Sequence, residues 1–410
     1  MITEKRALVT QPEVGEVSPD QKWFLRLFLL SLILPEILEF LFFGSPAARL
    51  ARLGILGIAG LQQIGAVRKG AQLEGPKLLS LILYACLVVT GVISFLLNAG
   101  VFPIYMFSAL IWLFLIARQN DGPKLHLDQV VRAAQILTLL STVAILLKLN
   151  NPFAFSQSNS SQYFVPFNDV LGLSGRQSGI LSHANQLAPV CVVAIVGALV
   201  SRKSLWQVPI YLFTLLTTGS TTSYISACVG ILFVYYGSGK FFRVITRSWV
   251  KALLAVIFVA TLSIVTSFWT INISNTLLTG RGFIWNQALL LLNNHWLFGL
   301  GWQFERTAIA QGILPPFAAS VHNTYLEWLT NFGIVGIALI LPTFILFLRN
   351  LSSANARLRS LSVTVLLFSF SESLINFGVF NVFTFAFMLC VWSSSMASNT
   401  AAQAARVDID

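Results

Sequence analysis

Three polar side chains stand at the start of a long hydrophobic run. The stretch SVHNTYLEW (320–328) contains His322, Asn323 and Glu327, and the run LTNFGIVGIALILPTFILFL follows it directly. The T-x-x-E pattern predicts a capping box, in which Thr324 caps the helix and the side chain of Glu327 accepts a hydrogen bond from the N–H of Thr324. His322 and Asn323 then fall just outside the helix, where its positive terminus favours a neutral imidazole that can accept a proton. Glu327 is therefore interpreted as structural and His322 as a candidate general base, with an interfacial histidine bonded to a loop as the alternative.

An arginine precedes another apolar run, as an anion site would require. The segment GLSGRQSGILSHANQLAP (172–189) carries Arg176 among glycines, followed by His183 and Asn185. Backbone N–H groups, the positive end of a helix and a guanidinium would converge there on a phosphate. A polar helix start capped by Ser182 or Asn185 explains the same residues. The sequence leaves both interpretations open.

A second arginine opens an apolar segment in a later loop. TGRGFIWNQALLLLNN (279–294) predicts a short helix lying along the membrane, with Arg281 at its N-terminus. A cation there opposes the helix dipole, so it is placed for an anionic ligand that both would attract. Trp285 shares that face and is either a substrate contact or an interface anchor. In the following FGLGW turn, Gly299 and Gly301 are predicted hinge or close-approach positions.

Three glutamates, Glu36, Glu39 and Glu372, lie inside apolar runs. Carboxylates are costly in a membrane, so each is a candidate for function, and an ion pair with another helix is the structural alternative. The four cysteines also lie in apolar runs, without metal-ligand spacing. There is no GxxxxGK[ST] and no HExxH sequence, so neither ATP nor a metal is predicted, and no cofactor is expected.

The elements that must position these residues are predicted to be membrane helices. The chain is 56% hydrophobic and only 10% charged, against about 25% charged in soluble domains. Its net charge of +11 comes from Lys and Arg grouped in short loops, which indicates the positive-inside bias and not a nucleic-acid partner. The fold class is therefore all-α, a polytopic membrane protein with about twelve transmembrane helices.

Hydropathy divides the chain into one membrane-embedded domain and two tails. Residues 1–22 and 397–410 are predicted cytoplasmic tails, and residues 23–396 the helical domain, with outer loops at about 150–185 and 270–325. The segment 48–66 carries Arg49 and Arg52 near its supposed outer end, so it is either a span or an interfacial or re-entrant helix. The predicted spans are 23–43, 48–66, 77–97, 99–117, 129–149, 186–201, 204–219, 222–238, 249–269, 326–348, 359–376 and 379–396.

The order of the polar motifs carries a resemblance. GRQSGILSHANQLAP, TTGSTTSYIS, TGRGFIWNQAL with FGLGW, and HNTYLEWLTNFGIVG follow one another along the chain. This series resembles the O-antigen ligase / O-antigen polymerase family of bacterial membrane proteins. The resemblance implies a GT-C-like helical fold in the cytoplasmic (inner) membrane. It also implies metal-independent, inverting transfer of a glycan on the outer face. The donor would be a glycan on undecaprenyl diphosphate, and the acceptor a sugar hydroxyl on a lipid- or glycan-linked molecule.

The resemblance also implies roles for particular residues. Arg176 and Arg281 would hold the diphosphate, His322 would be the essential histidine of the large outer loop, and Asn323 its companion. Thr221 stands in GSTTSY where the family often has arginine, so one phosphate contact would be missing.

Two other functions remain open at this level. Glu36, Glu39 and Glu372 could line a transport pathway, for example for inorganic carbon, although transporter sites usually lie at the midplane and the polar groups here gather in loops. The threonine at position 221 also permits an inactive scaffold among polysaccharide assembly proteins. Membrane lipids are expected neighbours under every interpretation.

Overall fold

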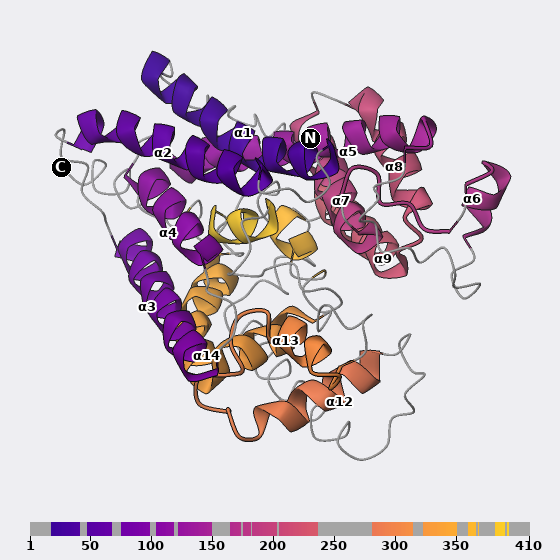
Figure 1. Cartoon of the computed structure of the whole chain (residues 1–410). Coiled ribbons are helices and arrows are strands. Elements are labelled where there is room, and N and C mark those ends of the chain that lie inside the picture. Colours follow the sequence, from indigo (N-terminus) through magenta and orange to yellow (C-terminus); the bar gives the residue numbers. More distant parts are fainter. Residues whose placement is uncertain are drawn as a thin grey trace, which may run out of the picture.

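The structure is a computed structural model in which part of the chain is described. These residues are 18–41, 47–67, 75–98, 104–118, 122–149, 165–173, 175–181, 183–202, 205–236, 281–314, 323–350, 360–365, 368, 382–389 and 392. Throughout these ranges the regular structure is helical and no strand occurs, so the prediction of an all-α chain is confirmed there. Figure 1 shows the helices packed side by side and crossing at various angles.

The helices follow the apolar runs of the sequence to within a few residues at most ends. They are α1 (Pro19–Leu41), α2 (Ala47–Val67), α3 (Gly75–Asn98), α4 (Ile104–Ala117), α5 (Gly122–Leu146), α6 (Pro166–Val170), α7 (Ala184–Ser201), η2 (Leu205–Gln207), α8 (Val208–Thr217), α9 (Thr221–Tyr236), α12 (Arg281–Leu292), α13 (Phe304–Ala310) and α14 (Thr324–Asn350). The helix predicted to open with Arg281 is confirmed as α12. The sequence did not indicate α6 or α13, which are too short for a periodic pattern to identify.

Four of the described helical segments are long and apolar enough to cross a membrane. They are Lys77–Asn98, Leu125–Leu146, Ala184–Ser201 and Thr324–Phe347. Other apolar helices, including those in α2, α4, α8 and α9, are shorter. Together they indicate an integral membrane protein, while the count of twelve spans stays a prediction. The predicted span 249–269 lies outside the described residues, as do most of the last two.

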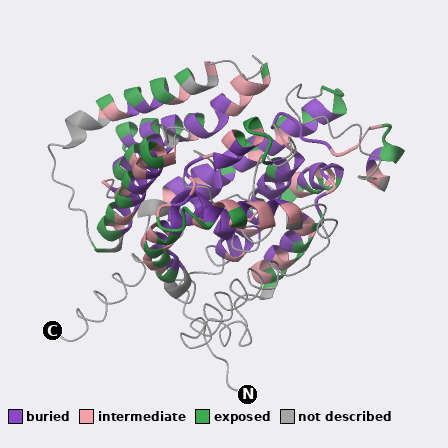
Figure 2. Ribbon diagram, turned by 60° about the horizontal axis from the view of Figure 1, so that its bottom comes forward, coloured by how far each residue is buried: buried purple, intermediate pink, exposed green. Residues whose placement is uncertain are grey.

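Helix α7 lies at the centre of the bundle. It packs against α5, α8 and α9, and its residues from Ala184 to Ala198 are buried apart from Gln186. A Cβ atom on Gly197 would lie 2.2 Å from a methyl carbon of Val131 on α5, so the two helices approach closely only because residue 197 is glycine. Figure 2 shows the buried residues filling the middle of the bundle, with exposed residues in stripes along the outer helices.

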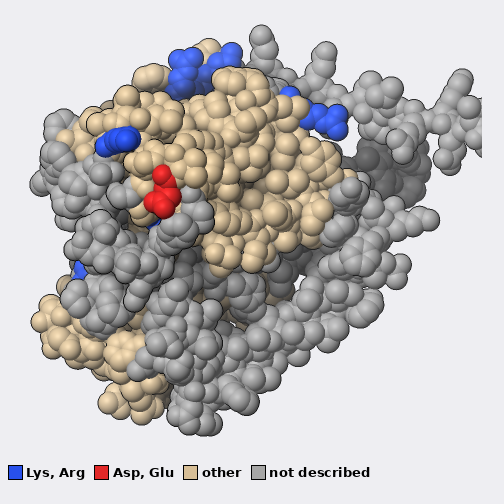
Figure 3. All heavy atoms as spheres, turned by 90° about the vertical axis from the view of Figure 1, so that its right-hand side faces the viewer, with Lys and Arg blue, Asp and Glu red and all other residues tan. Residues whose placement is uncertain are grey.

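The outer surface is apolar where lipid would contact it. On η2, α8 and α9, the exposed side chains include Trp206 (70% exposed), Leu216 (42%), Ile225 (58%) and Leu232 (50%). Figure 3 shows that the described surface on this side is largely uncharged, with most Lys and Arg atoms toward its upper edge. Large apolar side chains exposed on neighbouring helices are unfavourable in water and suit a bilayer.

An ion pair joins the first two helices. Nη2 of Arg52 on α2 donates to Oε1 of Glu36 on α1 at 2.9 Å, and both side chains are at least half-buried, with 13% and 26% exposed. The pair explains why an arginine is tolerated in the apolar segment 48–66, because a carboxylate on the neighbouring helix compensates its charge. Glu36 therefore has the structural partner that the sequence left open. Glu372 lies outside the described residues.

Helix α14 is interrupted at Gly333, which has φ 63° and ψ −163°. The N–H groups beyond the break donate to the turn after α12: Ile334 N to Trp296 O at 2.9 Å and Val335 N to Leu297 O at 3.1 Å. In return, Leu300 N donates to Thr330 O at 2.6 Å. The turn of residues 293–300, called here the inserted turn, thus supplies the hydrogen bonds that the break removes from α14.

Glycines make this contact possible from both sides. A Cβ atom on Gly299 (φ +77°) would lie 2.6 Å from backbone atoms of α14, and one on Gly333 would lie 2.4 Å from Leu297 O. Gly301 also has a positive φ of 94°. The prediction that Gly299 and Gly301 are close-approach or hinge positions is confirmed by these backbone conformations. The sequence did not single out Gly333, which lies among other small residues in FGIVG.

Replacing Glu36 by Gln or Arg52 by Gln should destabilise the α1–α2 pair, because each change leaves one charge buried without its partner. A double-mutant cycle on the detergent-solubilised protein should give a coupling free energy on the order of 1 kcal/mol. Additive effects of the two changes would show that the ion pair does not contribute.

Gly299→Ala and Gly333→Ala should each lower the free energy of unfolding by at least about 2 kcal/mol, because each combines left-handed backbone strain with overlap against backbone atoms. Gly312→Ala is the matched control, since Gly312 has φ +72° but nothing lies within 4 Å of an added Cβ. It should cost about 1 kcal/mol, from backbone strain alone. Thermal unfolding of the purified protein measures all three. Equal effects at the three positions would contradict the close approach of the inserted turn to α14.

Candidate functional site

Arg176 is fixed between the start of α7 and the turn that joins α8 to α9. Its Nε donates to Thr218 O at 2.7 Å, at the C-terminal end of α8, and its Nη2 donates to Asn185 Oδ1 at 2.5 Å, in the first turn of α7. The guanidinium therefore lies beside the positive N-terminal end of α7, while a carbonyl at the end of α8 holds it in place. The arginine charge and the start of α7 would both attract an anion there.

The loop that carries Arg176 is held against the α8–α9 turn by further hydrogen bonds. Gln177 N donates to Thr217 O at 3.0 Å. Asn168 Nδ2 donates to Gly175 O at 2.6 Å and to Thr217 O at 2.8 Å. Asn168 is 1% exposed, so its amide is a buried clamp between the two loops. No sequence signal indicated this role, because a single asparagine in a predicted outer loop has many possible roles.

Gly219 lets the α8–α9 turn approach the arginine. Its φ is +61°, and an added Cβ would lie 2.7 Å from Val165 Cγ2 and 3.3 Å from Arg176 Cγ. Ser220 follows, with its Oγ 2.8 Å from Ser223 Oγ. Thr221, where the resemblance led us to expect arginine, is exposed at the first position of α9. Near Arg176, the start of α9 therefore offers hydroxyl groups and backbone N–H groups. Position 221 adds no second positive charge, because it is threonine.

The helix α7 is capped by His183. Its backbone is extended (φ −150°, ψ 142°), and its Nδ1 accepts a hydrogen bond from Asn185 N at 3.0 Å. The predicted cap, Ser182 or Asn185, was wrong for Asn185, which lies inside the helix, and Ser182 lies outside the described residues. An Nδ1 that accepts a hydrogen bond carries no proton, so a neutral His183 here is the Nε2–H tautomer. Arg176, His183 and Asn185 are therefore brought together as one group.

The second group of candidates lies around α12 and the start of α14. Arg281 is the first residue of α12, and its side chain lies outside the described part of the structure. Trp285 is 7% exposed and packs in a small hydrophobic cluster that includes Phe304 of α13 and Leu326 of α14. This cluster holds the three helices together, and a direct contact between Trp285 and substrate stays a prediction.

Asn323 caps α14. Its Oδ1 accepts hydrogen bonds from Tyr325 N and Leu326 N, both at 3.0 Å. The predicted capping box was wrong by one residue, because the asparagine side chain reaches these N–H groups from the position before Thr324 and so makes Thr324 the first helical residue. Glu327 is buried at 6% exposure, and its N–H donates to Asn323 O at 2.9 Å. His322 lies just before the cap, outside the described residues.

A carboxyl group that the sequence did not single out is buried in the same unit. Glu305, on α13, is 4% exposed, and its Oε1 has no hydrogen-bond partner among the described residues. Burial raises the pKa of Glu305 to about 7, against a smaller lowering effect from its own backbone N–H and from Arg306. The only sequence signal was a lone acid in the apolar stretch GWQFE. Among the described residues, no three His, Cys, Asp or Glu side chains gather in a way that could hold a metal ion.

Residues 208–341 match the family model described as O-antigen ligase. This part of the chain, about a third of its length, is similar to the O-antigen ligase family. The matched region includes α8, α9, α12, α13 and most of α14, whereas Arg176, His183 and Asn185 precede it. The resemblance seen in the sequence is thereby confirmed, and it supports a role in O-antigen or polysaccharide assembly by a glycosyl-transferring membrane enzyme. No curated protein matches the chain.

The raised pKa of Glu305 predicts a pH dependence of stability. An unfolded chain holds this proton with a pKa of about 4.3, so between about pH 4.3 and 7 the folded state binds more protons than the unfolded state. Stability should therefore fall as pH rises through this window. Glu305→Gln should flatten that part of the profile, measured by thermal unfolding from pH 4 to 8. Asp169→Asn, at an exposed carboxylate, is the control, and an unchanged slope in the Glu305 variant would contradict the burial of a protonated carboxyl.

Proposed function

We propose that this chain is an enzyme of the O-antigen ligase type, which transfers a glycan from undecaprenyl diphosphate to a sugar hydroxyl on the outer face of the bacterial cytoplasmic membrane. The product would be ligated O-antigen or a lengthened surface polysaccharide, and both chain termini would lie in the cytoplasm. The observation that carries the proposal is the position of Arg176. Its guanidinium is fixed beside the N-terminal end of α7 and at the turn from α8 to α9, next to the matched region.

The leaving group of this reaction is a diphosphate, whose negative charge develops as the bond to the sugar breaks. Preorganised donors are most effective against such charge because they need no rearrangement during the reaction. Arg176 is preorganised in this way, since Thr218 O and the side chain of Asn185 fix the plane of its guanidinium. Arg281 would supply a second positive charge from the start of α12. These donors would allow the transfer to proceed without a metal or nucleotide.

The attacking hydroxyl needs a base. His322 is the residue we assign to this step, because it directly precedes the Asn323 cap of α14 and would lie near the positive end of that helix. The acceptor oxygen would form a bond to the anomeric carbon, the bond from that carbon to the phosphate oxygen would break, and the imidazole would take the hydroxyl proton. Attack opposite the leaving group inverts the anomeric centre. Asn323 would then act on His322 chiefly by fixing the helix start.

The two groups of residues can serve one reaction only if they face the same side of the membrane. The predicted topology places the starts of α7, α9 and α14 and the whole of α12 on the outer side. His183 and Asn185 would contribute to donor binding through the fixed start of α7, and Trp285 through the position of α12. The acceptor, lipid A-core or a second lipid-linked glycan, would reach the site from the outer leaflet.

The test is a set of single substitutions in a strain that lacks the native gene. Arg176→Ala, Arg281→Ala and His322→Ala should each lower glycan transfer by about 100-fold or more, the usual cost of removing a transition-state donor or base. Arg176→Lys should not restore activity, because an ammonium cannot reproduce the fixed fork of donors. Arg26→Ala, at an exposed arginine of α1, should retain wild-type transfer. The surface glycan ladder on gels and transfer from purified lipid-linked donor give the measurements.

Two acceptors separate the possible products. Supplying lipid A-core in one reaction and lipid-linked glycan in another assigns the enzyme as ligase or polymerase. A wild-type ladder from the Arg281 and His322 variants, at normal protein levels, would overturn the catalytic assignment.

A further inference from the structure

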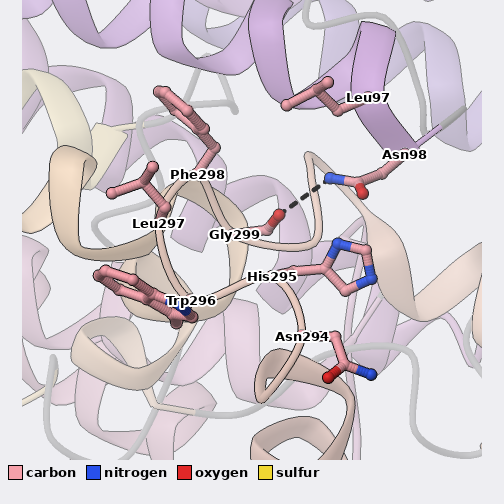
Figure 4. Close-up of a pocket in the computed structure, with 8 residues that line it drawn as sticks. All are labelled: Leu97, Asn98, Asn294, His295, Trp296, Leu297, Phe298 and Gly299. Atoms are coloured by element: carbon pink, nitrogen blue, oxygen red, sulfur yellow. Dashed lines mark hydrogen bonds between the residues drawn. The ribbon is translucent and has the colours of Figure 1, made fainter.

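A cavity lies apart from both groups of candidate residues. Its volume is about 290 Å³, and it is formed between the C-terminal end of α3 and the inserted turn that follows α12. Figure 4 shows Asn98, Asn294 and His295 together at one end of the cavity and Trp296 at the other. Gly299 forms the part of the wall between them.

Polar groups in the cavity are available for a ligand. Asn294 and His295 are exposed, and within the described part of the chain neither side chain forms a hydrogen bond. Asn98 donates from Nδ2 to Gly299 O at 2.9 Å and to Ser94 Oγ at 3.3 Å, so its amide is held in one orientation. The free amide of Asn294 and the imidazole of His295 together offer donors and acceptors.

The cavity is also rigid, because the inserted turn is bonded into the break of α14. The carbonyls of Trp296 and Leu297 accept from Ile334 and Val335, and Gly299 leaves no space between the turn and the helix. A site whose backbone is already fixed loses little conformational entropy when a ligand binds. Nothing in the proposed transfer reaction requires side chains at 294–296 to be presented in this fixed way.

The chemistry of the lining indicates an uncharged, hydroxyl-rich ligand. No Lys, Arg, Asp or Glu is among the lining residues that the structure describes, so this lining is unsuited to a diphosphate. Sugar hydroxyls both donate and accept hydrogen bonds, as amides and imidazoles do, and the C–H face of a pyranose ring packs on an indole such as that of Trp296. Trp296 is 55% exposed, which leaves its ring accessible.

The distance from the proposed reaction identifies the part of the glycan that would bind. The inserted turn follows the C-terminal end of α12, and a 12-residue helix separates it from Arg281, a length of about 18 Å. From this geometry we infer that the cavity binds a sugar unit several residues away from the bond that reacts. The inference rests on the proposed glycosyl transfer for the identity of the glycan. Its source is either the donor glycan or the acceptor oligosaccharide.

The test measures binding of lipid-free sugars to the purified full-length protein in nanodiscs, by saturation-transfer NMR and titration. One probe is an oligosaccharide of donor repeat units, the other is delipidated core oligosaccharide, and sugar-free undecaprenyl diphosphate is a third ligand. Asn294→Ala and Trp296→Ala should weaken binding of one of the two oligosaccharides by about tenfold or more and leave undecaprenyl diphosphate binding unchanged. Whichever oligosaccharide loses affinity identifies the source.

Each of the two variants has a matched control in which the same type of side chain is removed outside the cavity. Asn293→Ala removes an exposed asparagine next to Asn294 that does not line the cavity, and Trp206→Ala removes an exposed tryptophan elsewhere on the surface. Both should bind the oligosaccharides as the wild type does. Absence of saturable oligosaccharide binding in the wild type, or equal losses in the Asn293 and Asn294 variants, would overturn the inference. Equal losses in the two tryptophan variants would do the same and would assign Trp296 to membrane anchoring.

Measuring oligosaccharide binding tests this inference separately from the proposed transfer reaction. Sugar binding in the cavity does not use Arg176, Arg281 or His322, so inactive variants at those positions should still bind the oligosaccharide. Loss of transfer with retained sugar binding supports both proposals. Normal transfer in those variants would refute the catalytic assignment while leaving the cavity result intact.

Discussion

At Gly333 the backbone of α14 leaves the helical conformation, and the N–H groups that follow must find acceptors outside their own helix. In a membrane, water is not available to supply them. The inserted turn does so through the carbonyls of Trp296 and Leu297, while Thr330 O accepts from Leu300. This exchange of backbone hydrogen bonds ties the turn after α12 to a long apolar helix. The position of α12, of the sugar-sized cavity and of the cluster around Trp285 depends on it.

The same constraint operates at the start of α9, with a side chain as the donor. The carbonyl of Thr218 lies at a turn between two helices, and Arg176 Nε satisfies it. Asn168 does the same for Thr217 and Gly175. The residue that would bind phosphate is therefore also one that completes the hydrogen bonding of the fold. An arginine held in this way keeps its charge beside the start of α7 without losing side-chain freedom when ligand binds.

Two carboxyl groups, Glu36 and Glu305, are largely buried in the structure, and their surroundings differ. Arg52 and Glu36 form an ion pair between α1 and α2, so this acid has a structural partner. Within the described part of the chain, Glu305 has no such hydrogen-bonding partner for its Oε1, and its pKa is raised to about 7 as a result of burial. The two carboxyl groups differ in their surroundings, because a cation on the neighbouring helix pairs with Glu36, whereas burial has the larger effect on the pKa of Glu305.

The sequence by itself determined the helical class, most helix ends and the resemblance to the O-antigen ligase family. Apolar runs specify helices in a membrane whatever surrounds them, and the ordered motifs from Arg176 to Asn323 were sufficient for the resemblance. It also indicated Gly299 and Gly301, since glycine pairs in an apolar loop suggest unusual backbone. Only the tertiary structure showed that His183 caps α7, that Asn323 replaces Thr324 as the cap of α14, and that Gly333 accepts the inserted turn. Some of these features, like the Arg52–Glu36 pair and the burial of Glu305, depend on contacts between groups far apart in the sequence. The caps depend on which of several neighbouring side chains reaches the free N–H groups of the helix.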